Sequence, residues 1–220
     1  MEYTRLGRTG LSVSRTSFGA LPIQRIPESE STAILRAAYE AGINFYDTAN
    51  AYTDSEFKLG QALGDVRRNI IIATKTAPAA PEVMQQHLEQ SLKMLRTDYI
   101  DIYFAHAEDA GTPVEETLRA FDKLIRDGKV RCIGASNHQA WRLAEAELMA
   151  RAAGLPHYVV LQQRFSYLQP VVGADFGTQL PLTPEQTDFC ARHGVLLMAY
   201  SPLLGGLYEK PEIPVPVQYR

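Results

Sequence analysis

The chain has 220 residues, which is long enough for one sizeable hydrophobic core, and we expect a single domain over residues 1–220. Its formal net charge of −3 is small and evenly spread, which argues against nucleic acid or an anionic membrane as a partner. No apolar run is long enough to span a bilayer, and the N-terminus lacks a secretion-signal pattern. Two cysteines, Cys132 and Cys190, lie in apolar segments, so we expect reduced, buried thiols and a cytoplasmic location.

Predicted β-strands begin after a short N-terminal hairpin. Residues 1–14 consist of short polar and apolar pieces separated by Gly7 and Gly10, which indicates two strands and a turn. Seven apolar runs then follow along the chain: Thr16–Leu21, Ile43–Thr48, Ile70–Thr74, Ile100–Ala105, Val130–Ala135, Val159–Gln163 and Val195–Tyr200. Several of these runs are apolar at nearly every position, which is typical of strands that are covered on both faces.

Helical patterns separate these runs. They cover about Glu28–Ala41, a segment with Met84, Leu88, Leu92 and Leu95 on one face, Val114–Ile125, about Gln139–Ala153, and Thr183–His193. Two of them begin with the pattern of a capping box, at Thr112-Pro113-Val114-Glu115 and at Thr183-Pro184-Glu185-Gln186. Glycines end most of these helices.

Alternating strands and helices predict a parallel sheet with helices outside it, either open or closed into a barrel. No Gly-x-Gly-x-x-Gly turn follows a strand, so a Rossmann nucleotide site is not expected. Polar residues instead follow six successive strands, in the order Asp47 with Tyr52, Lys75, His106, Ser136-Asn137, Gln162-Gln163 and Tyr200-Ser201. A barrel gathers its site from the ends of many strands, so this distribution favours a TIM-type barrel.

These residues lie within longer motifs that occur in a fixed order. The motifs are Asn44-Phe45-Tyr46-Asp47-Thr48-Ala49-Asn50-Ala51-Tyr52 with Ser55-Glu56, Ala73-Thr74-Lys75, Tyr99-Ile100-Asp101-Ile102-Tyr103 before His106, Gly128-Lys129-Val130-Arg131-Cys132-Ile133-Gly134-Ala135-Ser136-Asn137, and Ala199-Tyr200-Ser201-Pro202-Leu203. In this combination the chain resembles the aldo-keto reductase family, from residue 1 to about residue 207. The resemblance implies a TIM (β/α)8 barrel and reduction of aldehydes or ketones to alcohols by hydride transfer from NADPH.

The resemblance also implies a role for each matched residue. Tyr52 would be the general acid that protonates the developing alkoxide, and Lys75 would lower its pKa. Asp47 would hold Lys75 charged, and His106 would orient the substrate carbonyl. The residues implied in cofactor binding are Ser136, Asn137 and Gln162 at the carboxamide, Tyr200 on the nicotinamide ring, and Ser201, Leu203 and Gly205 at the pyrophosphate. An apolar substrate pocket lined by Phe18, Leu21, Tyr46, Tyr52 and Phe165 is a weaker expectation.

Other polar residues have simpler structural interpretations. We expect Asp101, inside its strand, to be a structural partner, and Arg67-Arg68 to lie in a solvated loop. The remaining histidines, His87, His138, His157 and His193, are expected to be solvated or capping residues. No spacing of Cys, His or Asp indicates a metal site.

The chain departs from the family in its last part. Seven strands are predicted where a closed barrel has eight, and Pro211, Pro214 and Pro216 exclude a regular helix across the final residues. We therefore expect two open strand edges, apolar surface that favours self-association, and no segment that reads the 2′-phosphate of NADP. Three other hypotheses stay open: a non-catalytic regulatory or binding protein on the same scaffold, an inactive fragment, and a Schiff-base lyase that uses Lys75.

Overall fold

Seven parallel strands form a nearly closed barrel in the structure, a computed structural model that describes residues 1–77, 80–210 and 212–219. The strands are hydrogen-bonded in chain order: β3 (Phe18–Gly19), β4 (Phe45–Asp47), β5 (Ile71–Thr76), β6 (Ile100–Ala105), β7 (Val130–Ser136), β8 (Tyr158–Arg164) and β9 (Leu196–Tyr200). The seven predicted strands are thereby confirmed, although β3 is only two residues long.

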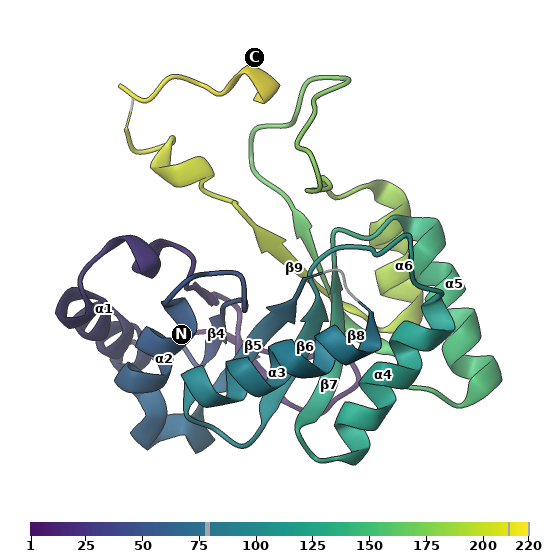
Figure 1. Cartoon of the computed structure of the whole chain (residues 1–220). Coiled ribbons are helices and arrows are strands. Elements are labelled where there is room, and N and C mark those ends of the chain that lie inside the picture. The colour runs from purple at the N-terminus through teal and green to yellow at the C-terminus, as the bar shows by residue number, and fades with distance from the viewer. Residues whose placement is uncertain (78–79, 211, 220) are drawn as a thin grey trace.

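Helices cover the outside of this sheet (Figure 1). They are α1 (Glu28–Glu40), α2 (Ser55–Leu63), α3 (Pro81–Leu95), α4 (Val114–Arg126), α5 (Ala140–Ala153) and α6 (Pro184–His193). The sequence did not predict α2, because Gly60 interrupts its pattern. Gly60 is needed there: a Cβ would lie 2.7 Å from the backbone of Leu95, so α2 packs closely against the end of α3.

The sheet separates two hydrophobic clusters. The outer cluster lies between sheet and helices, and the inner one fills the barrel with Phe45, Ile71, Ala73, Ile102, Phe104, Cys132 and Val160. Successive residues of a strand face opposite sides, so Tyr46 belongs to the outer cluster, where its hydroxyl donates to the carbonyl of Ile43. Its predicted place in a substrate pocket is wrong. Both cysteines are free and buried, as expected.

The N-terminal hairpin, β1 (Tyr3–Arg5) and β2 (Ser12–Ser14), is confirmed and closes one end of the barrel. Leu6 and Val13 are buried in the inner cluster. Gly7, with a φ of +48°, lies against the start of β8, where a Cβ would meet the carbonyl oxygen of Val159 at 2.8 Å. The hairpin therefore seals the end opposite to the carboxyl ends of the strands.

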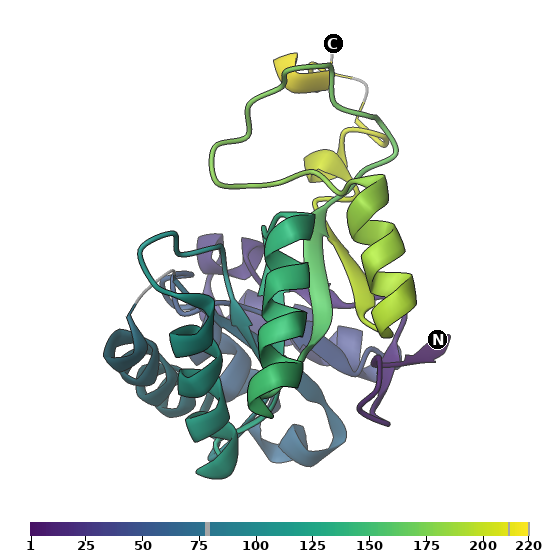
Figure 2. The ribbon, with the colours of Figure 1, turned by 90° about the vertical axis from the view of Figure 1, so that its right-hand side faces the viewer.

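The barrel wall stays open between β9 and β3, which are the two ends of the strand order and have no second neighbour among the described residues. Above this opening, the loop 165–182 and the described parts of the tail, 201–210 and 212–219, form a projection (Figure 2). Phe176 and Tyr219 pack their rings at 5.7 Å, and the Arg164 Nε donates to the Tyr219 hydroxyl at 3.0 Å. In the described part of the tail, only one short 3₁₀ turn follows residue 212, at Val217–Tyr219.

Two local predictions are wrong. The Thr112 hydroxyl does not cap α4, because it donates to the carboxylate of Asp109 at 2.7 Å, whereas the capping box at Thr183 forms with Gln186. Arg67 is not solvated, because its guanidinium turns inward onto the buried carboxylate of Asp101 at 2.7 Å.

Asp101 has the structural role that was expected. Its carboxylate is fully buried and also accepts from Arg131 at 2.8 Å and from the backbone N–H of Ile72 at 2.9 Å. These partners tie β5, β6 and β7 to the segment before β5. A buried carboxylate with three donors stabilises the fold because the buried guanidinium of Arg67 would otherwise lack a counter-ion.

Asp101→Asn should lower the free energy of unfolding by about 2 kcal/mol, because the amide removes the charge that two arginines share. Urea unfolding would measure this difference. Asp98→Asn, an exposed position in the same segment, is the matched control and should change stability by less than about 0.5 kcal/mol. Equal stability of the two variants would contradict the structural role of Asp101.

Candidate active site

The carboxyl ends of β4 and β5 place Asp47 beside Lys75. The Lys75 ammonium is fully buried and donates to Asp47 Oδ2 at 2.7 Å and to the carbonyl of Thr48 at 2.7 Å. Asp47 Oδ1 is also buried and has no hydrogen-bond partner in the described part of the chain. The ion pair therefore holds the Lys75 side chain in place and leaves one carboxylate oxygen available to a further donor.

Tyr52 and His106 are the other two of the four predicted catalytic residues, here called the quartet. The Lys75 Nζ lies 5.5 Å from the centre of the Tyr52 ring, and the rings of Tyr52 and His106 meet edge to face at 5.8 Å. Asp47, Tyr52, Lys75 and His106 thus come together from three strand ends, as the sequence predicted. The phenol of Tyr52, the imidazole of His106 and the ammonium of Lys75 surround one position. Such an arrangement can polarise and protonate a carbonyl group that binds there.

A buried network that the sequence analysis missed holds the Tyr52 loop in place. The Ser55 hydroxyl donates to the carbonyl of Ala20 at 2.8 Å and accepts from the Thr48 hydroxyl at 3.0 Å. One turn further along α2, the buried Lys58 ammonium contacts Asp54 at 2.8 Å. The spacing of Asp54 and Lys58 was a signal for this helix that could have been used.

The pKa of Tyr52 is raised above its usual value, first by burial and then by the negative charge of Asp47. Contrary to the expectation, the Lys75 charge does not bring this pKa below its usual value, because burial and the Asp47 carboxylate outweigh it. The negative charge of the Asp47 carboxylate opposes ionisation of the phenol, and burial adds a larger cost of charging it. Tyr52 is consequently a neutral phenol near pH 7, which is the form that can donate a proton.

The pKa of His106 falls to about 4, because burial and then the Lys75 charge disfavour the imidazolium. His138, expected to be solvated or capping, is instead 5% exposed, and burial also lowers its pKa to about 4. His138 turns inward because its Nδ1 hydrogen-bonds the carbonyl of Ser136 at 2.8 Å. Both imidazoles are therefore neutral at physiological pH.

Stability should fall as the pH drops from about 6.5 towards 4, because the unfolded chain then binds protons at these two histidines and the folded chain does not. Above pH about 7 these histidines should contribute no pH dependence. In the folded protein, the ring-proton NMR signals of His106 and His138 should stay constant from about pH 8 to about pH 5.5. A titration of either signal near pH 6.5 would contradict the buried, neutral assignment.

The ends of β7 and β8 bring Ser136, Asn137 and Gln162 together, all buried. Asn137, with a φ of 56°, has a fully engaged carboxamide. Its Nδ2 donates to the His106 carbonyl and to the Ser136 hydroxyl, and its Oδ1 accepts from the Tyr200 hydroxyl at 2.7 Å and from the Leu180 N–H at 3.0 Å. Among the described residues, the one hydrogen-bond partner of the Gln162 side chain is a sulfur, from its Nε2 to Met198 at 3.2 Å.

The loop after β9 carries the remaining predicted residues. Ser201 and Gly205 have φ values of 56° and 72°, and Leu203 is 66% exposed. The Leu204 N–H donates to the Ser201 carbonyl at 3.2 Å, which forms a tight turn. These residues lie next to one another at the open side of the barrel, beyond the end of β9.

Comparison with known proteins agrees with this geometry. The sequence model of the Aldo/keto reductase family matches residues 15–215. The chain belongs to this family. It is 34% identical over 232 residues to "Uncharacterized oxidoreductase YrpG" of Bacillus subtilis (strain 168), covering 94% of this chain and 68% of the relative. It is 33% identical to "Probable voltage-gated potassium channel subunit beta" of Oryza sativa subsp. japonica, covering 97% and 69%.

A solved structure has the same fold. The crystal structure of the thermostable aldo-keto reductase Tm1743 with the inhibitor epalrestat superposes with a TM-score of 0.80 at 31% identity, over 94% of this chain and 75% of that one. About a quarter to a third of these aldo-keto reductase relatives thus has no counterpart here.

The residues of this aldo-keto reductase site fit the nicotinamide end of a cofactor. Asp47 Oδ1 is a buried acceptor with no partner among the described residues, and the Gln162 carboxamide is nearly free. Asn137 would have to exchange its contacts with Tyr200 and Leu180 for a ligand. The buried Ser136 hydroxyl and the Gln162 carboxamide therefore fit a nicotinamide carboxamide, and Asn137 fits it once it releases Tyr200 and Leu180.

Within residues 1–77, 80–210 and 212–219, no helix is both long enough and apolar enough to cross a bilayer. Over the same ranges, no three side chains among His, Cys, Asp and Glu are grouped so that they could bind a metal ion.

Proposed function

We propose that this chain reduces aldehydes or ketones to alcohols, with Tyr52 as the general acid. The observation that supports this proposal is the buried Lys75–Asp47 ion pair, with the Tyr52 ring 5.5 Å from the ammonium and 5.8 Å from the His106 ring. Membership of the aldo/keto reductase family and an oxidoreductase relative support the same reaction class.

The proposed roles follow from the protonation states. NADPH, when bound, supplies the hydride. Tyr52 is a neutral phenol, so it can give its proton to the oxygen on which negative charge develops. The Lys75 charge, held in place by Asp47, stabilises the phenolate that remains. His106 is neutral, so its N–H can donate a hydrogen bond to the carbonyl and orient it without losing a proton.

We also propose that the nicotinamide end of the cofactor is held by Ser136, Asn137 and Gln162, with Tyr200 on the ring and Ser201, Leu203 and Gly205 near the pyrophosphate. The preference for NADP comes from the family resemblance alone. The test is oxidation of NADPH and of NADH, followed by absorbance, with a panel of aldehydes and ketones. Carbonyl-dependent oxidation supports the proposal, and cofactor binding without oxidation on any carbonyl contradicts it.

A second candidate is a non-catalytic binding or regulatory protein. One observation favours it: the carboxamide of Asn137 is fully engaged by Tyr200, Leu180, Ser136 and His106. The rice relative is named as a probable channel subunit, which supports this candidate. Nicotinamide fluorescence discriminates the two: saturable binding without turnover favours this candidate, and the absence of binding indicates an inactive chain. A Schiff-base lyase is disfavoured because the Lys75 nitrogen is occupied by Asp47 and by the Thr48 carbonyl.

The proposed partner is a small carbonyl compound, and the proposed location is the cytoplasm, where free cysteines such as Cys132 and Cys190 stay reduced.

We further propose that the chain self-associates through the open edges of β3 and β9, because unpaired strand edges bind other strands. Light scattering over a dilution series measures this association. A constant monomer mass at all concentrations contradicts it.

A further inference from the structure

The side chain of Asn137 has no free hydrogen-bonding position. Its Oδ1 accepts from the Tyr200 hydroxyl at 2.7 Å and from the Leu180 N–H at 3.0 Å. Its Nδ2 donates to the His106 carbonyl and to the Ser136 hydroxyl. An amide oxygen has two lone pairs and an amide nitrogen has two N–H groups, so all four positions are occupied. A nicotinamide carboxamide can therefore bind Asn137 only by displacing one of these partners.

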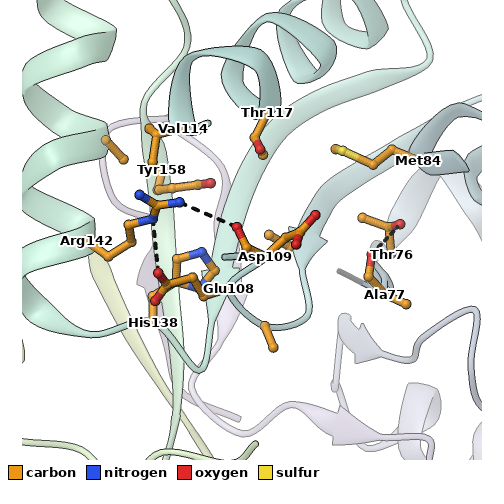
Figure 3. A pocket seen from close by; sticks show the side chains of 13 residues that line it. Thr76, Ala77, Met84, Glu108, Asp109, Val114, Thr117, His138, Arg142 and Tyr158 are labelled. Atoms are coloured by element: carbon orange, nitrogen blue, oxygen red, sulfur yellow. Dashed lines mark hydrogen bonds and ion pairs between the residues drawn. The ribbon is translucent and has the colours of Figure 1, made fainter. Parts of the chain in front are cut away.

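A ligand cannot reach Asn137 through the space between the sheet and the helices α3, α4 and α5. The cavity in that space is lined by His138, Arg142 and Tyr158 among others, and it holds about 30 Å³ (Figure 3). This volume has room for about two water molecules and none for a nicotinamide ring. The cofactor must therefore approach Asn137 from the mouth of the barrel, where Leu180 lies in the loop 165–182.

Leu180 is held beside Asn137 by the end of β8. Its carbonyl accepts from the Arg164 N–H at 3.1 Å, and the Arg164 carbonyl accepts from the Leu182 N–H at 2.8 Å. The Arg164 guanidinium also donates to Oε1 of Gln179, the residue before Leu180. Arg164 thus fixes the last part of the loop in the position that occupies Asn137.

The end of the tail holds Arg164 and the middle of the loop in turn. Tyr219 is 8% exposed, its hydroxyl accepts from Arg164 Nε at 3.0 Å, and its ring packs against Phe176 at 5.7 Å. The Val171 N–H donates to the Gln218 carbonyl at 2.8 Å. Figure 2 shows the loop and these last residues together at the top of the molecule.

Tyr208 holds the first part of the loop. Its hydroxyl accepts from the Leu168 N–H at 3.2 Å, and its ring meets the Tyr167 ring at 6.2 Å. The contacts between loop and tail that are described here are hydrogen bonds and ring contacts. They can therefore open without the separation of an ion pair, which makes opening less costly than for a buried charged contact.

We infer that the loop 165–182, held by Tyr208, Gln218 and Tyr219 and here called the tail latch, is an autoinhibitory contact that competes with the cofactor for Asn137. While the tail latch is closed, the Leu180 N–H occupies the oxygen that the nicotinamide carboxamide needs. This inference rests on the proposed cofactor site. Because latch closure and cofactor binding exclude each other at Asn137, a weaker latch should tighten cofactor binding, and bound cofactor should open the latch.

Tyr219→Ala in the full 220-residue chain tests this inference, because it removes the contacts with Phe176 and Arg164 and changes no residue of the proposed active site. Amide hydrogen exchange in the loop, measured by NMR, should become about ten-fold faster. NADPH, titrated by nicotinamide fluorescence, should bind about three-fold more tightly. Tyr219→Phe keeps the ring and should change both quantities less. Tyr3→Ala, which removes an exposed tyrosine bonded to the Gly42 carbonyl, is the matched control and should change neither.

The unmodified chain provides the reciprocal test, because saturating NADPH should speed the exchange of the Leu180 amide. Unchanged loop exchange or unchanged NADPH affinity in Tyr219→Ala overturns the inference and leaves the proposed function intact. A Leu180 amide that stays protected with NADPH bound also overturns it. NADPH binding to neither protein contradicts the proposed cofactor site, and the competition with it. If Tyr219→Ala does not fold, Phe176→Ala removes the same ring contact from the loop side and decides in its place.

Discussion

Tyr52→Phe should reduce the rate of carbonyl reduction by about 10²–10⁴-fold, the usual contribution of a positioned general acid. The substitution removes one oxygen atom and keeps the ring that packs against His106 and over Lys75. The fold and the affinity for cofactor should therefore be retained. Steady-state kinetics with the best carbonyl of the panel, together with cofactor titration by nicotinamide fluorescence, would measure both.

The matched control is Tyr46→Phe, which removes the hydroxyl of a fully buried tyrosine of the outer cluster. Its turnover should stay within about two-fold of the unmodified chain, because its hydroxyl contacts only the Ile43 carbonyl. If Tyr52→Phe and Tyr46→Phe turn over equally, Tyr52 is not the acid.

Lys75→Met should destabilise the fold by about 3–5 kcal/mol as well as abolish turnover. Asp47 is 8% exposed, and the substitution would leave its carboxylate buried without its cation. The Thr48 carbonyl would also lose its donor. Urea unfolding near pH 7 measures the loss, and circular dichroism shows whether the variant is folded.

Removing the unpaired charge of Asp47 from the Lys75→Met variant should restore part of this stability. The double variant Asp47→Asn with Lys75→Met should be more stable than Lys75→Met alone, because a neutral amide costs less to bury than an unpaired carboxylate. Turnover should not return, since Lys75 is still absent. A double variant that is no more stable than Lys75→Met would show that the two side chains are not coupled through charge.

Much of the fold could be predicted from periodicity and from the positions of polar residues. Seven strands, five of six helices and the hairpin follow from local patterns that the tertiary structure did not override. The quartet was predictable because parallel strands carry their carboxyl ends to one rim. At that rim the Lys75 Nζ lies 2.7 Å from Asp47 Oδ2, although the two residues are 28 positions apart in the sequence.

The errors share a cause, which is that a side chain's surroundings depend on residues far away in the sequence. Arg67 was predicted to be solvated because its partner in the ion pair, Asp101, lies 34 positions later in the sequence. Thr112 matches a capping box, but Asp109 competes for its hydroxyl. The upward shift in the pKa of Tyr52 depends on burial, which no local pattern reports.

The central claim is that hydride transfer and protonation by Tyr52 occur in one site. The most direct measurement uses NADPH that carries deuterium at its transferable position, with a carbonyl substrate and mass spectrometry of the product. The alcohol from the unmodified chain should carry deuterium on the former carbonyl carbon, and Tyr52→Phe should yield almost none. Bound cofactor with no deuterium in the product, or equal labelling by both proteins, would contradict the account.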